Sequence, residues 1–514
     1  MSKTIIIIGA GLAGLSAALQ AAENGCNVKL VSSLPSERAQ SVMAEGGINA
    51  ALNTKDKNDS PEEHFTDTIK AACGLADPNA VWGMTQAAPE LVHWLLKLGV
   101  KFNMSGYDDV DLRNFGGQKK KRTAFAQSDT GKQIMTAMID AVRRKEASGM
   151  VERFSHHSFL TLRLCGNICC GCVIRDEYSQ ETVELPGDAV IVATGGMHGL
   201  FGNTTGSLSN TGEVTAELFR LGVPLANGEM IQYHPTTVKC GGKRMLISEA
   251  ARGEGGRLFA MKDGKQWYFM EEKYPELGNL MPRDITAREI WKVSHESEVF
   301  LDMTEISEEV ISNKLSGLAD DCMTYLHKDI RKEPVPVLPG IHYFMGGILV
   351  DEQHRTPIQN LYAAGECCAQ YHGANRLGGN SLLGALYGGR VAAKSACEQA
   401  DVVDLSCATQ IDFPPASQIS EIKQLNKVMQ ETMGVVRNEN TLLNGIQTVQ
   451  ALTGNLPLLG MAVLKSALAR KESRGAHWRE DYPKSNDDDY LKTTVARFDG
   501  KQIQISFVPV PERR

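Results

Sequence analysis

The chain has 514 residues, of which 54 are basic and 61 acidic, and its formal charge is −7. Hydrophobic residues at 42% and charged residues at 22% are ordinary for a globular protein and exclude a disordered or collagen-like chain. The acidic balance argues against nucleic acid as a partner, because phosphate binding requires clustered positive charge. At about 150 residues per domain, a chain of this length is expected to hold roughly three domains.

The N-terminal segment MSKTIIIIGAGLAG has neither the long apolar core nor the small-residue cleavage site of a signal peptide. No apolar run of the sequence approaches the ~20 residues of a membrane-spanning helix. We therefore expect a cytoplasmic protein, which partner subunits could hold peripherally at the cytoplasmic membrane.

Residues 4–31 carry the most specific local pattern. A β-branched apolar run at residues 4–8 predicts a buried parallel strand. Residues 15–24 predict a helix rich in Ala and Leu, and residues 28–31 predict a second strand. A glycine-rich turn between the first strand and the helix completes a unit that is typical of dinucleotide binding.

Each glycine of this turn has a physical reason to be there. Gly9 permits the tight turn, Gly11 lets the backbone approach a pyrophosphate, and Gly14 lets the helix pack on the strand. The helix N-terminus then faces the anion. The acidic ribose ligand usual at the end of the second strand is absent, and Ser32 stands there with a hydroxyl that can bond a ribose.

Four cysteines crowd together in the string RLCGNICCGCVI: Cys165, Cys169, Cys170 and Cys172. Their spacing fits no metal-ligand pattern, and the flanking residues predict a β-hairpin that turns at Gly166-Asn167. We interpret them as small strand residues, buried or half-buried, and expect no metal site.

Two glycine-rich strand ends far downstream indicate which dinucleotide is bound. Residues 189–196 read AVIVATGG, and residues 360–366 read NLYAAGE. Late strands that return to the first sheet are typical of FAD-dependent folds, whereas an NAD domain is usually one contiguous segment. The split pattern therefore favours FAD.

The remaining segments indicate two further domains. The stretch between residues 232 and 342 lacks the strand–turn–helix rhythm, and apolar spacing predicts helices at residues 419–433, 439–452 and 458–471. Pro414-Pro415 marks a boundary. We predict an α/β fold with a Rossmann-like FAD-binding domain (1–231 and 342–413), an inserted α+β capping domain (232–341), and a C-terminal helical domain with a tail (414–514).

Polar strings gather at the edges of these domains: QYHPT (232–236), SEAARGEGG (248–256), PRD (282–284), IHYFMGGI (341–348) and HGANRLGGNSLL (372–383). Two of their His, His234 and His342, together with three Arg and a hydroxyl, form a candidate set close to a flavin. Arg forks bind carboxylates in bidentate fashion, and His can cap the remaining oxygens. The set therefore suits a small dicarboxylate.

These strings, together with SVMAEGGINAA (41–51), FGG (115–117) and SRGAHWRED (473–481), resemble the flavoprotein subunits of fumarate reductase and succinate dehydrogenase, and the related L-aspartate oxidases. The resemblance runs from the first strand to about Pro483. It implies hydride transfer between FAD and one carbon of a C4 dicarboxylate, fumarate or succinate, with a proton moving at the neighbouring carbon. An electron-transport role in anaerobic respiration would follow.

The resemblance also implies roles for individual residues. Arg283 matches the proton donor, and Glu249 and Arg252 match a proton relay. The residues matching those that hold the carboxylates are His234, Ser248, His342 and Arg376, with Phe125 as an aromatic beside the substrate. The expected FAD contacts are Gly9, Gly11, Ala13, Gly14, Ser32, Ser41, Ala44, Gly46, Gly47, Ala193, Thr194, Gly195, Glu366, Ser381 and Leu382.

One position departs from the respiratory pattern. Where those proteins carry a His that links FAD covalently, this chain has Gln40, whose carboxamide cannot form that bond. We therefore expect non-covalent FAD. Loss of the link generally lowers the flavin potential in this family, which favours fumarate reduction over succinate oxidation.

Four functions fit the strings. The first is a fumarate reductase flavoprotein subunit fed by an iron–sulfur partner, since the chain has no cluster motif of its own. The others are an L-aspartate oxidase, a reductase of another unsaturated acid, and a redox-inactive FAD scaffold. The LGGNS string (377–381) is nearer the reductase form than the oxidase form, and a scaffold has no use for Arg283 beside a flavin.

Overall fold

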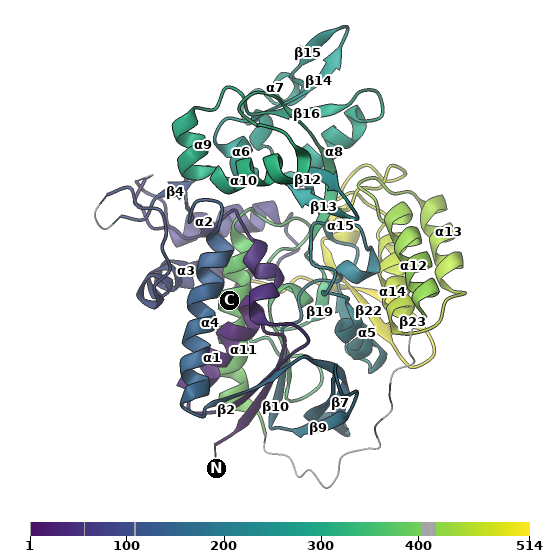
Figure 1. Ribbon diagram of the computed structural model, residues 1–514. Helices are drawn as coiled ribbons and strands as arrows, with labels where there is room; N and C mark the ends of the chain where they lie inside the picture. Colours follow the sequence, from purple (N-terminus) through teal and green to yellow (C-terminus); the bar gives the residue numbers. More distant parts are fainter. Residues whose placement is uncertain (1, 56, 107–108, 402–410, 412, 414–417) are drawn as a thin grey trace.

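The computed structural model describes residues 2–514 apart from 56, 107–108, 402–410, 412 and 414–417, so the Pro414-Pro415 boundary lies outside the described residues. Figure 1 shows the predicted capping domain in teal and green at the top, above the predicted FAD-binding domain, with the C-terminal helices in yellow at the right. Within the described part of the chain, no helix is long and apolar enough to cross a bilayer.

A parallel sheet forms the centre of the FAD-binding domain. Its strand order is β20 (Leu361–Ala363), β10 (Ala189–Val192), β1 (Thr4–Ile8), β2 (Asn27–Ser32) and β6 (Val151–Ser155). Every neighbouring pair in it is parallel. The predicted first two strands and the return of two late strands to the same sheet are thus confirmed.

The two faces of this sheet are covered differently, because successive side chains of β1 point to opposite sides. Ile5 and Ile7 belong to a core shared with four helices: α1 (Leu12–Glu23), α3 (Pro78–Leu98), α4 (Thr130–Ala147) and α11 (Asn380–Gln399). Ile6 and Ile8 pack on the other side, against the sheet of β7 (His157–Cys165), β8 (Ile168–Asp176) and β9 (Thr182–Pro186).

The cysteine cluster lies in this second sheet. Cys165 ends β7 and pairs with Ile168 at the start of β8, so the expected turn at Gly166-Asn167 is present. The β8 cysteines are buried: Cys169, Cys170 and Cys172. No group of three or more His, Cys, Asp or Glu residues in the described part of the chain could hold a metal ion.

The capping domain leaves and returns through one antiparallel strand pair. In β12 (Ile231–Cys240) and β18 (Leu338–Phe344), Gln232 pairs with Tyr343 and Tyr233 with Ile341. β13 (Lys243–Leu246) adds a third strand to this sheet. The expected boundaries at 231/232 and 341/342 fall in these two strands, although the domain division itself remains a prediction.

The outer part of the capping domain combines a second sheet with short helices. The sheet order is β15 (Lys265–Trp267), β14 (Arg257–Lys262), β16 (Val299–Asp302) and β17 (Val335–Pro336). The helices are α6 (Glu249–Gly253), α7 (Phe269–Lys273), α8 (Arg283–Val293), α9 (Glu308–Lys314) and α10 (Ser316–Asp321). Leu258, Ile290 and Leu301 are fully buried in their common core.

Three smaller segments complete the FAD-binding domain. A short sheet has the order β3 (Ile48–Asn49), β5 (Thr123–Ala124) and β4 (Leu112–Arg113). Helix α2 (Pro61–Ala71) packs beside α3, and α5 (Glu213–Arg220) packs beside α14 of the C-terminal domain.

The C-terminal domain contains the three predicted helices, α12 (Ile419–Thr432), α13 (Glu439–Val449) and α14 (Asn455–Ala469), around a shared apolar core. The tail beyond them is not irregular. It forms α15 (Asp487–Tyr490) and an antiparallel hairpin of β22 (Lys492–Phe498) and β23 (Ile503–Pro509). This hairpin extends a sheet of β21 (Cys368–Ala369), β19 (Gly347–Leu349) and β11 (Leu225–Ala226) from the FAD-binding domain.

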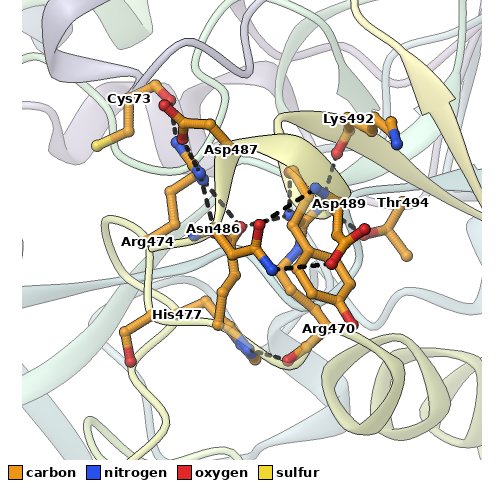
Figure 2. A network of polar contacts seen from close by, with 12 residues as sticks. Cys73, Arg470, Arg474, His477, Asn486, Asp487, Asp489, Lys492 and Thr494 are labelled. Atoms are coloured by element: carbon orange, nitrogen blue, oxygen red, sulfur yellow. Dashed lines mark hydrogen bonds and ion pairs between the residues drawn. The ribbon is translucent and has the colours of Figure 1, made fainter. Parts of the chain in front are cut away.

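A buried ionic network holds the tail in place, as Figure 2 shows. Arg470 donates from Nε to Glu229 Oε1 at 2.7 Å and from Nη2 to Thr494 Oγ1 at 2.7 Å. Arg474 pairs with Glu472 at 2.8 Å and also donates to the carbonyl oxygen of Cys73. The network therefore joins the C-terminal region to the FAD-binding domain.

Candidate active site

A cavity of about 1050 Å³ runs between the FAD-binding domain and the capping domain. One end, here the cofactor end, lies beyond the carboxyl ends of β1, β2 and β10, which is where parallel α/β sheets bind ligands. The other end, here the charged end, is lined by Phe115, His234, Ser248, Glu249, Arg283, His342 and Arg376.

The glycine turn at the cofactor end leaves no room for side chains. Gly9 has a φ of +109°, and a Cβ there would lie 2.3 Å from the carbonyl oxygen of Ala193. A Cβ on Gly14 would lie 1.8 Å from the carbonyl oxygen of Gly9. Gly11 and Leu12, at the start of α1, line the cavity, and the Leu12 N–H donates to Ser41 Oγ at 3.3 Å, so the helix begins at the cavity wall.

One orphaned polar atom fits the ribose of a dinucleotide. Ser32 Oγ is buried in the cavity wall and has no hydrogen-bond partner among the described residues. A hydroxyl left unpaired in this way is costly unless a ligand supplies the partner. Among the expected FAD contacts, all but Gly14 line the cavity, and Gly14 instead packs against the turn.

At the charged end, Glu249 and Arg283 form a buried ion pair. Arg283 Nε donates to Glu249 Oε2 at 2.7 Å and Arg283 Nη2 lies 2.6 Å from the same oxygen, while the Gly116 N–H donates to Oε1 at 2.9 Å. Arg252 Nη2 lies 3.7 Å from the same carboxylate. Burial acts to raise the pKa of Glu249, but the two arginines outweigh it and hold this pKa below its usual range.

The two histidines of this end face each other. The rings of His234 and His342 lie 5.2 Å apart, edge to face. Burial, reinforced by neighbouring positive groups that include Arg283, holds the pKa of both rings well below the usual value. Both are therefore neutral near pH 7.

Arg376 lies across the cavity from α8, on the loop before α11. Its guanidinium carbon is 4.3 Å from the centre of the Tyr343 ring, and its Nε has no hydrogen-bond partner among the described residues. Burial, reinforced by Arg283, lowers the pKa of Arg376 to about 9, so the group is still charged at pH 7. It is thus a buried cation with unused donors.

Ser248 begins α6, where its hydroxyl accepts a hydrogen bond from the Ala250 N–H at 3.4 Å. Because α6 carries Glu249 and Arg252, the two residues expected to form a proton relay, this cap fixes Ser248, Glu249 and Arg252 relative to one another. The structure brings Ser248 and Glu249 together with the two histidines, Arg283 and Arg376 in the cavity lining, whereas Arg252 does not line the cavity and lies 3.7 Å from Glu249.

Phe125 is the one expected substrate residue that the structure places elsewhere. It is fully buried beneath the Arg113 guanidinium, 3.6 Å from its ring centre, and does not line the cavity. Phe115, ten residues earlier, lines the charged end instead. The FGG string carried the signal, because Gly116 in that string also donates to Glu249.

Gln232 is a site residue that the sequence analysis missed. Its Oε1 accepts from Arg283 Nη1 at 3.1 Å, and its Nε2 donates to the carbonyl oxygen of Arg376 at 2.9 Å. The side-chain amide of Gln232 therefore bridges the Arg283 guanidinium and the main chain of Arg376. Nothing in the sequence marks it except its place beside His234 in the QYHPT string.

Gln40 also lines the cavity. Its Oε1 accepts a hydrogen bond from the Ser207 N–H at 2.5 Å, which joins the segment before α2 to the loop after β10. A carboxamide is thus present at this wall where the resemblance placed a histidine.

The charges of this end do not balance. Arg252, Arg283 and Arg376 are buried cations, the histidines are neutral, and Glu249 is the counter-charge among them. Among these six buried side chains, three positive groups and one negative group leave a net charge of +2, and Glu45, which also lines the cavity, has its pKa raised to about 8 by burial and is therefore mostly neutral near pH 7. Glu366, at the cofactor end, has its pKa raised to about 7 by burial. The charged end is therefore suited to a ligand with two negative charges.

Comparison with known proteins identifies the family to which the chain belongs. The FAD binding domain family matches residues 4–382, and the fumarate reductase flavoprotein C-terminal family matches residues 452–513. The succinate dehydrogenase flavoprotein subunit of Bacillus subtilis is 38% identical over 100% of this chain and 98% of its own length. The 8-methylmenaquinol:fumarate reductase flavoprotein subunit of Wolinella succinogenes is 32% identical over 100% of this chain and 92% of its own.

A solved structure agrees over the full length. The flavoprotein chain of Escherichia coli quinol fumarate reductase superposes with a TM-score of 0.90 at 28% identity, covering 99% of this chain and 97% of that one. The chain described here belongs to the fumarate reductase and succinate dehydrogenase flavoprotein family, and it is an FAD-dependent oxidoreductase of that type.

Proposed function

We propose that the chain is the flavoprotein subunit of a fumarate reductase, which binds fumarate at the charged end of the cavity and releases succinate. The net charge of +2 carries this proposal, because fumarate is a dianion of matching charge. The buried guanidinium of Arg376, with unused donors, supports a role in holding one carboxylate. His234, His342 and Ser248 would supply the remaining donors.

Bound FAD would supply the hydride to one alkene carbon. Arg283 would give the proton to the neighbouring carbon. An Arg has too high a pKa to be a good acid by itself, so its action depends on position and on rapid resupply. The ion pair of Arg283 with Glu249, and the Arg252 guanidinium 3.7 Å from the same carboxylate, support a resupply path. Hydrogen bonds from the protein to both substrate carboxylates would also polarise the alkene toward its transition state.

The cofactor is proposed to be held without a covalent bond, since Gln40 has no nucleophilic ring nitrogen. Acid precipitation tests this: yellow flavin should stay in the supernatant, and a yellow pellet would contradict it. Electrons would come from an iron–sulfur subunit. We propose that the same partner subunit holds the chain peripherally at the cytoplasmic membrane.

The activity is tested by anaerobic oxidation of reduced benzyl viologen by the purified holoprotein, with and without fumarate. Rapid fumarate-dependent oxidation is expected. Bound flavin without such oxidation would overturn the proposal, and oxidation of L-aspartate or reduction of another unsaturated acid would then be measured on the same sample. Succinate oxidation faster than fumarate reduction at matched driving force would reverse the proposed direction.

A further inference from the structure

The two histidines of the charged end differ in what binds their inner nitrogen. His342 Nδ1 lies 2.8 Å from Thr205 Oγ1. His234 Nδ1 lies 3.0 Å from the carbonyl oxygen of Thr236, 3.3 Å from its backbone nitrogen and 3.4 Å, the limit of a hydrogen bond, from its hydroxyl oxygen. Each tautomer of His234 therefore finds a backbone partner, whereas the partner of His342 is a hydroxyl with a single proton.

The neighbours of Thr205 decide where that proton points. The other acceptor within reach, the carbonyl oxygen of Ile341, is 3.4 Å from Thr205 Oγ1, at the limit of a hydrogen bond. That oxygen already accepts from the Thr205 N–H at 3.0 Å. The hydroxyl is thus better placed to donate to His342 Nδ1.

A neutral imidazole has one N–H, and a nitrogen that accepts a hydrogen bond cannot also carry it. Because burial and the nearby cationic groups keep the pKa of His342 well below its usual value, this ring is neutral. If Thr205 donates to Nδ1, the proton must be on Nε2. A ring with the opposite tautomer would present a lone pair to a carboxylate and repel it.

The loop that carries Thr205 is held at several points. The Thr205 N–H donates to Ile341, and two residues later the Ser207 N–H donates to Gln40 Oε1 at 2.5 Å. A Cβ on Gly206 would lie 2.2 Å from the His198 ring, so the loop is packed without spare space. Gln40 therefore contacts the same loop, at Ser207, from which Thr205 contacts His342.

We propose that Thr205 is a positioning residue for dicarboxylate binding: its hydroxyl donates to His342 Nδ1 and so keeps an Nε2–H pointed at the substrate carboxylate. Gln40 holds the loop from which Thr205 acts. The inference rests on the proposed function for the identity of the ligand, a C4 dicarboxylate, but not on the direction of the reaction.

The experiment measures fumarate binding to the oxidised holoprotein through the change in flavin absorbance. Thr205→Val keeps the shape and removes the donor, so the Kd for fumarate should rise about 5- to 10-fold, the range of one lost hydrogen bond. Thr205→Ser should restore it to within about twofold, because the donor returns. FAD content and Tm of both variants should match the unaltered protein.

A double-mutant cycle separates action through His342 from a general loosening of the loop. In the His342→Gln variant the amide can donate without help from Thr205. Adding Thr205→Val to that variant should therefore change the Kd by less than about twofold. Equal effects of Thr205→Val in both backgrounds would overturn the inference, as would a failure of Thr205→Ser to rescue.

Failure of the proposed function gives a different result. An unaltered holoprotein that binds fumarate but does not reduce it contradicts the reductase proposal, while the variants still decide the role of Thr205. An unaltered holoprotein that binds no dicarboxylate contradicts both.

Discussion

The cofactor end and the charged end of the cavity differ in which atoms face the ligand. At the cofactor end, the lining includes many glycines and short side chains, among them Gly9, Gly11, Ala13, Gly46 and Gly47, so the main chain lies close to the ligand there. At the charged end, long side chains converge from β12, α6, α8 and β18 and from the loop before α11. Cofactor binding at the first end should therefore be sensitive to added atoms, and substrate binding and turnover at the second end to the loss of charge.

The largest effect is expected at the charged end. Arg283→Ala removes the proposed proton donor and should lower fumarate-dependent turnover by about 10³- to 10⁴-fold while FAD stays bound. Lys292→Ala is the matched control, since Lys292 lies on the same helix and pairs with Glu289 at 3.4 Å, away from the cavity. Turnover retained in Arg283→Ala would move the proton donor to another group.

At the cofactor end the corresponding change adds a methyl group. Gly9→Ala puts a Cβ 2.3 Å from the Ala193 carbonyl oxygen at a φ that L residues rarely adopt. We expect the Kd for FAD to rise about 10- to 100-fold, measured by fluorescence of the released flavin. Gly242→Ala, where no atom lies within 4 Å of the added Cβ, should bind FAD normally. Equal FAD affinity in both variants would contradict the close approach of backbone to cofactor.

A substitution of Gln40 in the cavity wall should have a smaller effect on FAD binding. Gln40→Ala removes the acceptor for the Ser207 N–H, and the loss of one hydrogen bond should raise the Kd for FAD about fivefold. Equilibrium dialysis of the two proteins checks this. An unchanged Kd would mean that the contact does not help to hold the cofactor.

The smallest effect expected is on stability, and it depends on pH. Burial, with Asp321 and Asp129 nearby, raises the pKa of Glu45 from 4.5 to about 8, and Arg113 opposes the shift only in part. The folded protein keeps a proton that the unfolded chain releases above about pH 4.5. Stability is therefore lost progressively as pH rises from there to about 8.

Glu45→Gln removes that dependence. Its Tm should exceed that of the unaltered protein by a few degrees at pH 8.5 and differ little at pH 5. Differential scanning calorimetry at the two pH values checks the sign. The same difference at both values would show that the Glu45 carboxyl does not titrate in this range.

The cofactor end was the more predictable of the two because its constraints are local. Three glycines at fixed spacing after a β-branched strand define the turn, and the strand itself appears at Thr4–Ile8 as expected. The charged end has no such spacing rule, and its members came from the family resemblance. The resemblance named Phe125 as the aromatic beside the substrate, and only the fold shows that Phe115, ten residues earlier, reaches the cavity instead.

Two omissions differ in kind. Gln232 acts through an uncharged amide between two arginines, and no sequence pattern marks such a spacer. The C-terminal hairpin did leave a signal: residues 503–507 alternate in polarity, and Asp499-Gly500 lies at the turn between the two strands. That signal is short and follows a helical region, so the sequence predicts only a tail there.

The central claim is that the charged end, with its net charge of +2, binds a dianion. Calorimetric titration of the oxidised holoprotein with fumarate and with crotonate, which has the same alkene but one carboxylate, tests it most directly. We expect fumarate to bind at least about 100-fold more tightly, because crotonate would leave a buried cation unpaired. Equal affinity for the two acids would contradict the account.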